Sequence, residues 1–416
     1  MENMRILRLR AYYTPEQTAS SYLDEDMNEA YKKYDITIVN YTPMPTRGVS
    51  EDVRRIYKDR KYEEMYDGHV IVHRFSMFRE GKNPIQRALR YVCCSVKEYF
   101  LGIKEENIDV VYSGSTPPTQ GALSAIVAKK LSKKYKRRIP FVYNLQDVFP
   151  DSLVNTGMTH EETLLWKIGR KIENFTYKNA DKIIVISDGF KRNIMSKGVP
   201  EEKIEVISNW IDTDEVHPVD KYKNSLYEEF GISRDKYIVL YAGNFGAAQG
   251  ADIVLKVAEY LNKEKNIKFV IFGGGAYFQE AKAQAASLPN VIINGLLPQE
   301  RVSEVYSLGD VALITCKPGT GNAGMPSKTW SIMACNTPII ASFDTDSDLA
   351  DVIKASGAGQ CVEPGNVEKL AEAILNEFNK NTIQLNLRDY VKRYASKEAC
   401  VSRYIDELSS VAMERN

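Results

Sequence analysis

The feature that most constrains the fold is an alternation of short apolar, β-rich runs with helical patterns. In the first half of the chain, such runs are separated by periodic segments, for example residues 121–135 and 163–180. Continuous apolar strands separated by helices are typical of a parallel sheet that is covered on both faces. The strands predicted in the first half are residues 36–40, 69–75, 108–114, 139–147, 182–187 and 204–209.

The alternation restarts after a polar stretch at residues 213–236. We therefore predict two doubly wound, Rossmann-like α/β domains, residues 1–212 and 213–389, that face each other across a cleft. A terminal amphipathic helix, about residues 390–416, is expected to pack back on the first domain. The strands predicted in the second half are residues 237–243, 268–274, 291–296, 310–315, 337–344 and 360–364.

Composition narrows the class of function. The 416 residues include 55 basic and 55 acidic residues, so no global charge favours nucleic acid. Six cysteines without a C-x-x-C pair, together with only four histidines, argue against a zinc site or a disulfide framework. No apolar run is long enough for a signal peptide or a membrane span. We expect a soluble cytoplasmic protein with reduced thiols and no cofactor.

The most informative segment is residues 317–340, KPGTGNAGMPSKTWSIMACNTPII, which follows the strand at 310–315. Its glycine-rich loop leads into a helix that Ser327 would cap and that Lys328 would begin. Free N–H groups and the positive end of a helix dipole suit an anion, and Lys328 adds a charge that an anion would compensate. The alternative is a plain strand–loop–helix with a capping serine and a solvated lysine.

Two further glycine clusters also follow strands, at residues 243–250 and 273–275. Neither fits the dinucleotide pattern G-x-G-x-x-G with an acidic residue about twenty positions further on. Taken singly, each is read most simply as a tight turn. Three such loops after strands of one domain would line the same rim, which favours a binding site.

Carboxylates follow strands at two places. Asp147 ends the predicted segment 139–147 and Asp151 follows it, at a place where a carboxylate can bind sugar hydroxyls or transfer a proton. For Asp151, helix capping is the simpler interpretation. The acidic cluster Asp344–Asp348 suggests a divalent metal, but N-capping of the next helix explains it more simply, so we predict no metal site.

The run Lys129–Arg138 holds seven basic residues in ten. Such a run can meet acidic lipid head groups and hold a protein at the inner face of the cell membrane. The alternative is a solvated helix face.

Several segments together resemble glycosyltransferase family 4 enzymes of the GT-B fold over nearly the whole chain. In particular, the chain is similar to the bacterial N-acetylfucosamine-transferase-like proteins of polysaccharide assembly. The segment GMPSKTWSIMACNTPIIAS from Gly324 is the most specific match. The other matching segments are YTPEQTASSY (from Tyr13), LQDVFPDSL (from Leu145), ADKIIVIS (from Ala180), ISNWIDTDEV (from Ile207), YAGNFGAAQG (from Tyr241) and FVIFGGG (from Phe269).

The resemblance implies a retaining, metal-independent glycosyltransferase of hexosyl or N-acetylhexosaminyl type that uses a nucleotide-diphosphate sugar, with UDP-sugar the expected donor. The second domain would hold the nucleotide and the first would bind the acceptor. A saccharide acceptor, expected to be lipid-linked, would place the enzyme in capsule, O-antigen or exopolysaccharide synthesis.

The resemblance also assigns site residues by position. Lys328 would neutralise the donor diphosphate. For catalysis we add Asp147 as our own hypothesis, in which it orients the acceptor hydroxyl or takes its proton. The backbone around Leu296 and Leu297 would meet the base. The residues expected to bind the donor are Thr18, Ala19, Gly243, Asn244, Gly246, Gly274, Leu296, Leu297, Arg301, Gly324, Met325, Pro326, Ser327, Lys328 and Ser331.

The chain departs from the family pattern at several of these places. Ala323 and Ser331 stand where many members carry two glutamates, Asn244 and Gln249 replace an arginine–lysine pair, and Gln146 replaces a histidine. Two alternatives therefore stay open: a nucleotide-sugar 2-epimerase of the same architecture, and a non-catalytic sugar- or nucleotide-binding relative.

Overall fold

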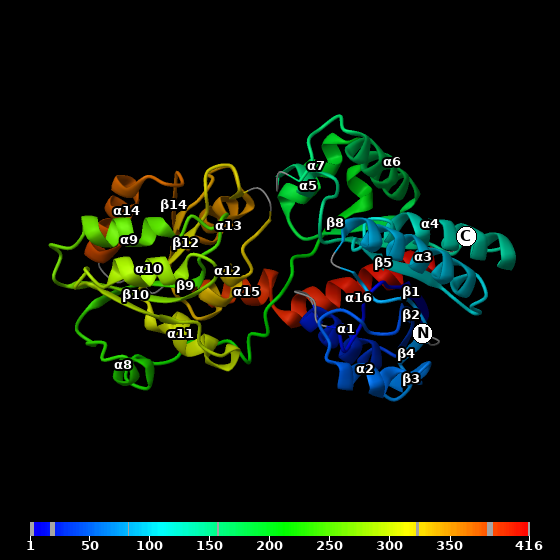
Figure 1. Ribbon diagram of the computed structural model, residues 1–416, viewed down its shortest axis with the longest axis horizontal. Helices are drawn as coiled ribbons and strands as arrows, with labels where there is room; N and C mark the ends of the chain where they lie inside the picture. Colours follow the sequence, from blue (N-terminus) through cyan, green and yellow to red (C-terminus); the bar gives the residue numbers. More distant parts are fainter. Residues whose placement is uncertain are drawn as a thin grey trace. The chain divides into compact units, whose positions relative to one another are not determined.

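The chain folds into two compact units, shown in a computed structural model that describes residues 4–16, 21–81, 83–155, 158–321, 324–380 and 386–414 (Figure 1). The first unit comprises Met1–Ser208 and Cys400–Asn416, and the second comprises Asn209–Ala399. The last helix, α16 (Lys397–Met413), therefore belongs to the first unit from Cys400 onward. Each unit is a doubly wound α/β sheet, which confirms the predicted fold class.

The first unit is built on an eight-stranded sheet of order β3-β4-β2-β1-β5-β6-β7-β8. All neighbours pair in parallel except β3 and β4, which pair antiparallel. Its strands are β1 (Met4–Leu9), β2 (Ile36–Pro43), β3 (Tyr62–Met65), β4 (Val70–Phe75), β5 (Val110–Gly114), β6 (Phe141–Leu145), β7 (Lys182–Val185) and β8 (Ile204–Val206). Its helices, besides α16, are α1 (Ser21–Lys33), α2 (Glu51–Tyr57), α3 (Pro84–Gly102), α4 (Gln120–Tyr135), α5 (Asp151–Asn155), α6 (Leu164–Asn179), α7 (Asp188–Ser196) and the short η1 (Glu201–Lys203).

Alternation along β1 shows how this sheet is covered. Leu7 and Leu9 lie in the buried cluster that residues of α4, α6 and α7 complete on one face. Arg8 points to the other face, where its guanidinium donates to Asp24 of α1 at 2.9 Å. Tyr404 of α16 lies on that second face as well, and its hydroxyl donates to Asn144 of β6 at 3.2 Å. Helices thus cover both faces, as a parallel sheet requires.

The second unit carries a six-stranded parallel sheet of order β11-β10-β9-β12-β13-β14. In chain order this is 3-2-1-4-5-6, the order of dinucleotide-type Rossmann sheets. Its strands are β9 (Tyr237–Asn244), β10 (Ile267–Gly274), β11 (Val291–Gly295), β12 (Val311–Thr315), β13 (Ile339–Ser342) and β14 (Gly359–Val362). Its helices are α8 (Leu226–Glu229), α9 (Asp252–Tyr260), α10 (Phe278–Ala285), η2 (Gln299–Arg301), α11 (Val302–Leu308), α12 (Lys328–Ala334), α13 (Asp348–Ser356), α14 (Val367–Asn379) and α15 (Leu387–Tyr394).

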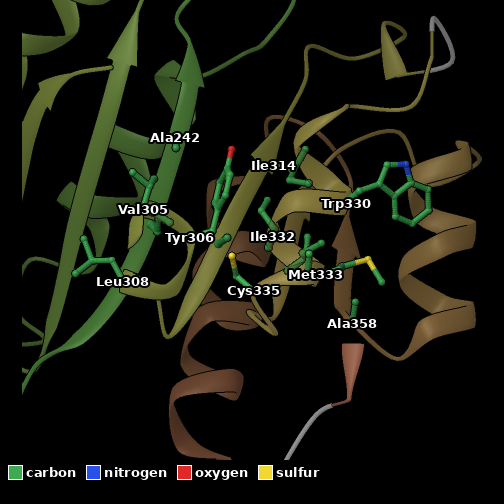
Figure 2. Packing of buried hydrophobic residues seen from close by; sticks show 14 of the residues in the cluster. Ala242, Val305, Tyr306, Leu308, Ile314, Trp330, Ile332, Met333, Cys335 and Ala358 are labelled. Carbon is green, nitrogen blue, oxygen red and sulfur yellow. The ribbon is translucent and has the colours of Figure 1, made fainter. Parts of the chain in front are cut away.

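The short helix α12 is fixed by the core beneath it. Figure 2 shows Trp330, Ile332 and Met333 of α12 packed near Ile314 of β12, in a cluster that also holds Tyr306 of α11. Each of these side chains is at least nine-tenths buried. Burial of a large apolar side chain contributes about 1.5–3 kcal/mol. The first residue of α12, Lys328, is therefore held in place at the carboxyl end of β12.

Candidate functional site

The strand order of the second unit has its switch point between β9 and β12. From β9 the chain runs outward through β10 and β11 in one direction, and from β12 it continues through β13 and β14 in the other. Loops at such a switch point part from each other and leave room for a ligand at the carboxyl ends of the strands. The loops after β9 and β12 contain the glycine clusters near Gly246 and Gly319. Glycines are thus concentrated at this switch point, where the backbone can approach a ligand closely.

Lys328 reaches from α12 to the end of β9. Its Nζ donates to the carbonyl oxygen of Ala242 at 3.3 Å and lies 4.4 Å from the centroid of the Tyr241 ring. A Cβ built on Gly243 would be 3.1 Å from Nζ, so a side chain at this position would crowd the ammonium group. An aromatic face and a carbonyl oxygen stabilise a cation without cancelling its charge.

No carboxylate pairs with Lys328 among the residues that the structure describes. Burial lowers the pKa of Lys328 to about 8, because the charged form loses solvation that no anion replaces. At pH 7 the side chain is still mostly protonated. The result is a cation that lies at the end of β9 and is available to a negatively charged ligand.

The adjacent rim is formed by Asn244, Gly274 and Leu296. The Asn244 Oδ1 atom would be 1.9 Å from a Cβ on Gly275, whose φ of +106° also favours glycine. A Cβ on Gly274 would lie 3.1 Å from Cδ1 of Leu296, so the loops after β9, β10 and β11 meet here. Leu296 is more than half exposed. An exposed apolar side chain beside a glycine-lined rim can contact a flat ring.

Gly246 and Gln249 belong to the loop that follows β9. A Cβ on Gly246 would be 2.5 Å from Oε1 of Gln249 and 2.7 Å from Nδ2 of Asn244. Because of this crowding, only a glycine leaves these two amide side chains where they lie. The two residues that replace the family's basic pair thus form a neutral, polar edge.

The loop after β12 is tied to its neighbours on both sides. The Lys317 amide donates to the carbonyl oxygen of Ala248 at 2.9 Å. On the other side, the Asp344 carboxylate accepts from the amides of Gly319 at 3.0 Å and Gly321 at 2.7 Å. Asp344 therefore shapes the glycine loop, a role that the sequence did not reveal because β13 separates the two segments.

The end of this cluster forms the start of α13. The Ser347 hydroxyl accepts from the Ala350 amide as the N-cap, and Asp348 lies in the first turn. The cap is thus a serine, where we predicted acidic residues. Within the described parts of the chain, no three His, Cys, Asp or Glu residues are arranged to hold a metal ion.

The start of α12 differs from prediction in one respect. Ser327 occupies the N-cap position, as predicted, but its side chain makes no capping hydrogen bond. Its hydroxyl is exposed and free of the helix. Met325 packs partly against the core, Pro326 accepts from the Thr329 amide at 3.0 Å, and Ser331 is buried in the helix. Gly324 adopts a φ of +150° with open space around its Cα.

Arg301 occupies a different environment from Lys328. Its guanidinium binds Glu304 and Glu229, each at 2.7 Å, and donates to Ser225 at 2.9 Å. The hydrogen bonds to Glu304 and Glu229 raise its pKa. Its charge is already neutralised, so it is a weaker candidate for a phosphate ligand than we predicted. Leu297, nearby, packs against the core.

In the first unit, Asp147 lies just past the carboxyl end of β6. Its side chain is exposed and makes no hydrogen bond or ion pair with the residues that the structure describes. Its amide and that of Gln146 donate to the Ser115 hydroxyl at 3.1 and 3.0 Å, which fixes the turn. Asp147 therefore presents a free carboxylate on an ordered backbone.

Asp151 has a structural role beyond the capping that we predicted. It accepts from Arg170 at 2.6 Å and from Lys197 at 2.8 Å, and so ties α5 to α6 and α7. Burial alone would raise its pKa, but the hydrogen bond and charge of Lys197, with Asn193 and Arg170, hold the pKa below its ordinary value. Its carboxylate is fully engaged.

Three predicted positions cannot be placed. Thr18, Ala19 and Ala323 lie outside the described residues. One residue was missed: Tyr241, whose ring faces the Lys328 ammonium. Its only signal in the sequence was its position three residues before Asn244, at the end of an apolar strand.

A solvent-open pocket adjoins this site on the outer side of Gly246. Phe245, Tyr277 and Leu255 line it, together with the carboxylates of Asp252 and Glu280 and the ammonium of Lys317. Two carboxylates make it a poor site for a diphosphate. The rim around Lys328 is the better candidate.

Two α/β sheets of this kind in one chain are the architecture of the GT-B class of glycosyltransferases. Two family models match the chain: "Glycosyltransferase Family 4" over residues 32–215 and "Glycosyl transferases group 1" over residues 223–398. The chain is a glycosyltransferase of the GT-B type, similar to these families in both of its units.

Curated relatives and a solved structure agree with this assignment. The probable glycosyltransferase WbjE of Pseudomonas aeruginosa is 26% identical over 72% of this chain and 76% of its own length. The putative colanic acid biosynthesis glycosyl transferase WcaI of Escherichia coli is 26% identical over 64% of this chain and 67% of its own. The fold also matches Anabaena Alr3699/HepE, solved with UDP and glucose, with a TM-score of 0.66, 16% identity and coverage of 98% and 100%.

Among the described residues, no helix has both the length and the apolar character that a membrane span requires.

Proposed function

We propose that this chain is a retaining, metal-independent glycosyltransferase that moves a hexosyl or N-acetylhexosaminyl group from a UDP-sugar to a saccharide acceptor. The observation that carries the proposal is Lys328, a half-buried cation at the switch point of the second sheet that pairs with no carboxylate among the described residues. The structure of HepE with UDP, in a protein of the same fold, supports a uridine donor.

The proposed chemistry needs charge stabilisation at the diphosphate. As the bond from the anomeric carbon to the diphosphate oxygen breaks, negative charge grows on the leaving group. A cation that is already held in place stabilises that charge without having to reorganise. Lys328 supplies the cation, and the amides around Gly324 and Ser327 are the proposed donors beside it. Asp344 binds backbone amides, which supports a mechanism that uses no metal.

The acceptor hydroxyl attacks the anomeric carbon from the side that the diphosphate leaves, which retains the configuration. We assign Asp147 to orient this hydroxyl or to accept its proton, because its carboxylate is exposed and unpaired among the described residues. Closure of the two units over the donor would exclude water and prevent hydrolysis.

We further propose a lipid-linked saccharide acceptor and a role in surface polysaccharide synthesis at the inner face of the cell membrane. The colanic acid function named for WcaI supports the pathway class, and six free cysteines fit a reducing compartment. The N-acetylfucosamine-transferase subgroup remains part of the proposal on the sequence motifs alone.

The first test is a thermal-shift screen of UDP, GDP, ADP and CMP with and without EDTA. A ligand at a hundred times its Kd adds about 2.7 kcal/mol of stability. A shift with UDP that survives EDTA is expected. A shift that EDTA removes would overturn the metal-independent mechanism, and a shift with GDP alone would change the donor.

Turnover separates the transferase from its two rivals. Release of UDP that depends on an acceptor supports transfer. Isomerised donor in a reaction without acceptor would point to the 2-epimerase, and tight UDP binding without turnover on any acceptor would point to the binding relative.

A further inference from the structure

Helix α3 exposes apolar side chains on one side and buries charged side chains on the opposite side. Leu89, Val92, Val96 and Phe100 are each more than half exposed, and their spacing of three and four residues places them on one side of the helix. The opposite side buries Arg90 and Glu98 completely. An exposed apolar stripe over a buried polar face is uncommon, because it leaves apolar surface in water that nothing in the unit covers.

Helix α6 repeats this arrangement. Leu164, Leu165, Ile168 and Phe175 are exposed, Leu164 to 75%, whereas Glu173 and Tyr177 are buried. The lysines of this helix, at 167, 171 and 178, are exposed as well. Its outer side thus alternates apolar side chains with cations.

Helix α4 lies between the other two and contacts both. A Cβ on its Gly121 would be 2.5 Å from the Thr176 methyl group of α6, so the two helices approach closely. The Nζ of Lys129 lies 5.7 Å from the ring centroid of Phe175, which joins the two outer faces. Figure 1 shows α3, α4 and α6 in the first unit, in cyan and green. We call the outer surface of α3, α4 and α6 the three-helix face.

The charge of the three-helix face has one sign. The only acidic residues within the three helices are Glu98 and Glu173, and both are buried. On α4, Lys129, Lys130 and Lys133 are exposed and form no ion pair with the described residues. Nearby carboxylates lie in loops, where Glu162 pairs with Lys167 and Asp181 pairs with Arg138.

We propose that the three-helix face docks on an anionic lipid surface. Apolar side chains at this face would enter the boundary between head groups and acyl chains, and the lysines would extend their ammonium groups to the lipid phosphates. This combination of apolar and cationic residues, without exposed carboxylates in the three helices themselves, complements a negatively charged bilayer. A second copy of this face would instead bring like charges together.

Topology connects the surface to the acceptor site. A helix that links two parallel strands runs against them, so α3, α4 and α6 begin at the edge where the strands end. Asp147 lies at that same edge, after β6. A lipid-linked acceptor held at the bilayer would therefore reach Asp147 from the three-helix face, a step that rests on the proposed function, whereas the docking itself does not.

The test is flotation of the full chain with vesicles of phosphatidylcholine, alone or with one-third phosphatidylglycerol, at low and at physiological salt. One variant removes apolar contacts (Val92→Gln, Val96→Gln, Phe100→Gln) and another reverses charge (Lys129→Glu, Lys130→Glu, Lys133→Glu). Matched controls change exposed residues of the second unit: Tyr222→Gln with Tyr260→Gln, and Lys223→Glu, Lys263→Glu, Lys265→Glu. Circular dichroism melts of the full chain verify that every variant is folded.

We expect binding only to anionic vesicles, weakened by salt because the Debye length shortens. Each variant of the three-helix face should bind the vesicles at least tenfold more weakly. For the charge variant, the reason is that each lysine near the surface contributes about fivefold. The controls should bind as the parent does.

No binding to anionic vesicles at low salt would overturn the proposal, as would face variants that bind normally. Self-association that the apolar variant abolishes, without vesicle binding, would assign the face to a second copy. Loss of UDP binding in the parent would instead contradict the proposed function.

Discussion

Lys328 carries its charge without a carboxylate partner among the described residues. Its depressed pKa of about 8, caused by burial, means that an anion beside it should draw the proton back. We therefore predict that UDP affinity is constant from pH 6 to about 7.5 and falls up to tenfold per pH unit above pH 8. Isothermal titration calorimetry across this range measures it, and proton uptake on binding at pH 8 is the accompanying signature. An affinity that stays flat to pH 9.5 would separate Lys328 from the phosphates.

The same shift makes a prediction for stability. Since the folded pKa lies below the unfolded value of 10.5, the unfolded chain binds more protons between pH 8 and 10.5, and Lys328 makes stability rise with pH in that window. Lys328→Met keeps the stem and removes the charge, so it should stabilise the apo protein by about 1–2 kcal/mol at pH 7. Transfer rate should fall about a hundredfold. Denaturant melts and initial rates measure the two effects, and a variant that is less stable yet fully active would refute both.

Asp147 and Asp151 lie four residues apart, but of the two only Asp151 forms ion pairs with described residues. The two positions therefore form a matched pair for mutation. Asp147→Asn should reduce turnover by about 10²–10⁴-fold without a change in Tm, because its carboxylate holds no structural partner within the described chain. Asp151→Asn should lower Tm, because it weakens the bonds to Arg170 and Lys197, and should leave the pH profile of turnover unchanged. Normal turnover with a normal pH profile in Asp147→Asn would end its proposed role.

At the scale of elements, the rim of the second sheet depends on close packing of loops. Gly275→Ala would place a Cβ 1.9 Å from Oδ1 of Asn244, so that side chain must move, and the φ of +106° strains any residue that has a Cβ. We predict a stability loss of about 1–3 kcal/mol and weaker UDP binding. Gly295→Ala, at the end of β11, meets nothing within 4 Å and serves as the control. Equal behaviour of the two variants in denaturant melts and UDP titrations would contradict this account.

The sequence predicted the elements that obey simple periodicity. All six strands of the second sheet and helices α4, α6 and α16 were predicted, because buried parallel strands read as apolar runs. Strand β1 was missed because Arg5 and Arg8 interrupt its apolar pattern. In the structure, Arg8 is buried and paired with Asp24, a compensation that lies sixteen residues away. Strand β3 is a polar edge strand with no apolar run.

Periodicity identifies a helix without saying which side is covered. The side of α3 that the structure buries carries Arg90 and Glu98, and the exposed side carries Val92 and Phe100. Long-range contacts decide this, so no reading of residues 84–102 alone could find the three-helix face. For the same reason the loop and lysine at 317–328 were predicted, but the partners that hold them, Tyr241 and Asp344, were not.

At the scale of the whole molecule, the chain leaves the first unit at Ser208 and returns to it at Cys400. The second unit is thus continuous in sequence, whereas the first is completed by α16. Tyr404 and Leu408 of that helix are buried, and Glu407 pairs with Lys182 at 3.2 Å. Removal of α16 would expose the face of the first sheet that holds Arg8 and Asn144.

We therefore predict that residues 209–399, produced alone, fold cooperatively and bind UDP with the same decline above pH 8 as the full chain, because Lys328, Tyr241 and the loops that hold them all lie in that unit. Residues 1–208 alone should aggregate, and a Gly/Ser linker to residues 400–416 should restore a cooperative melt. Circular dichroism melts and UDP titration measure both. If the 209–399 fragment folds but does not bind UDP, the donor site needs residues of the first unit, and Lys328 alone does not define it. If residues 1–208 fold as well without α16 as with it, the first unit does not need this helix to fold.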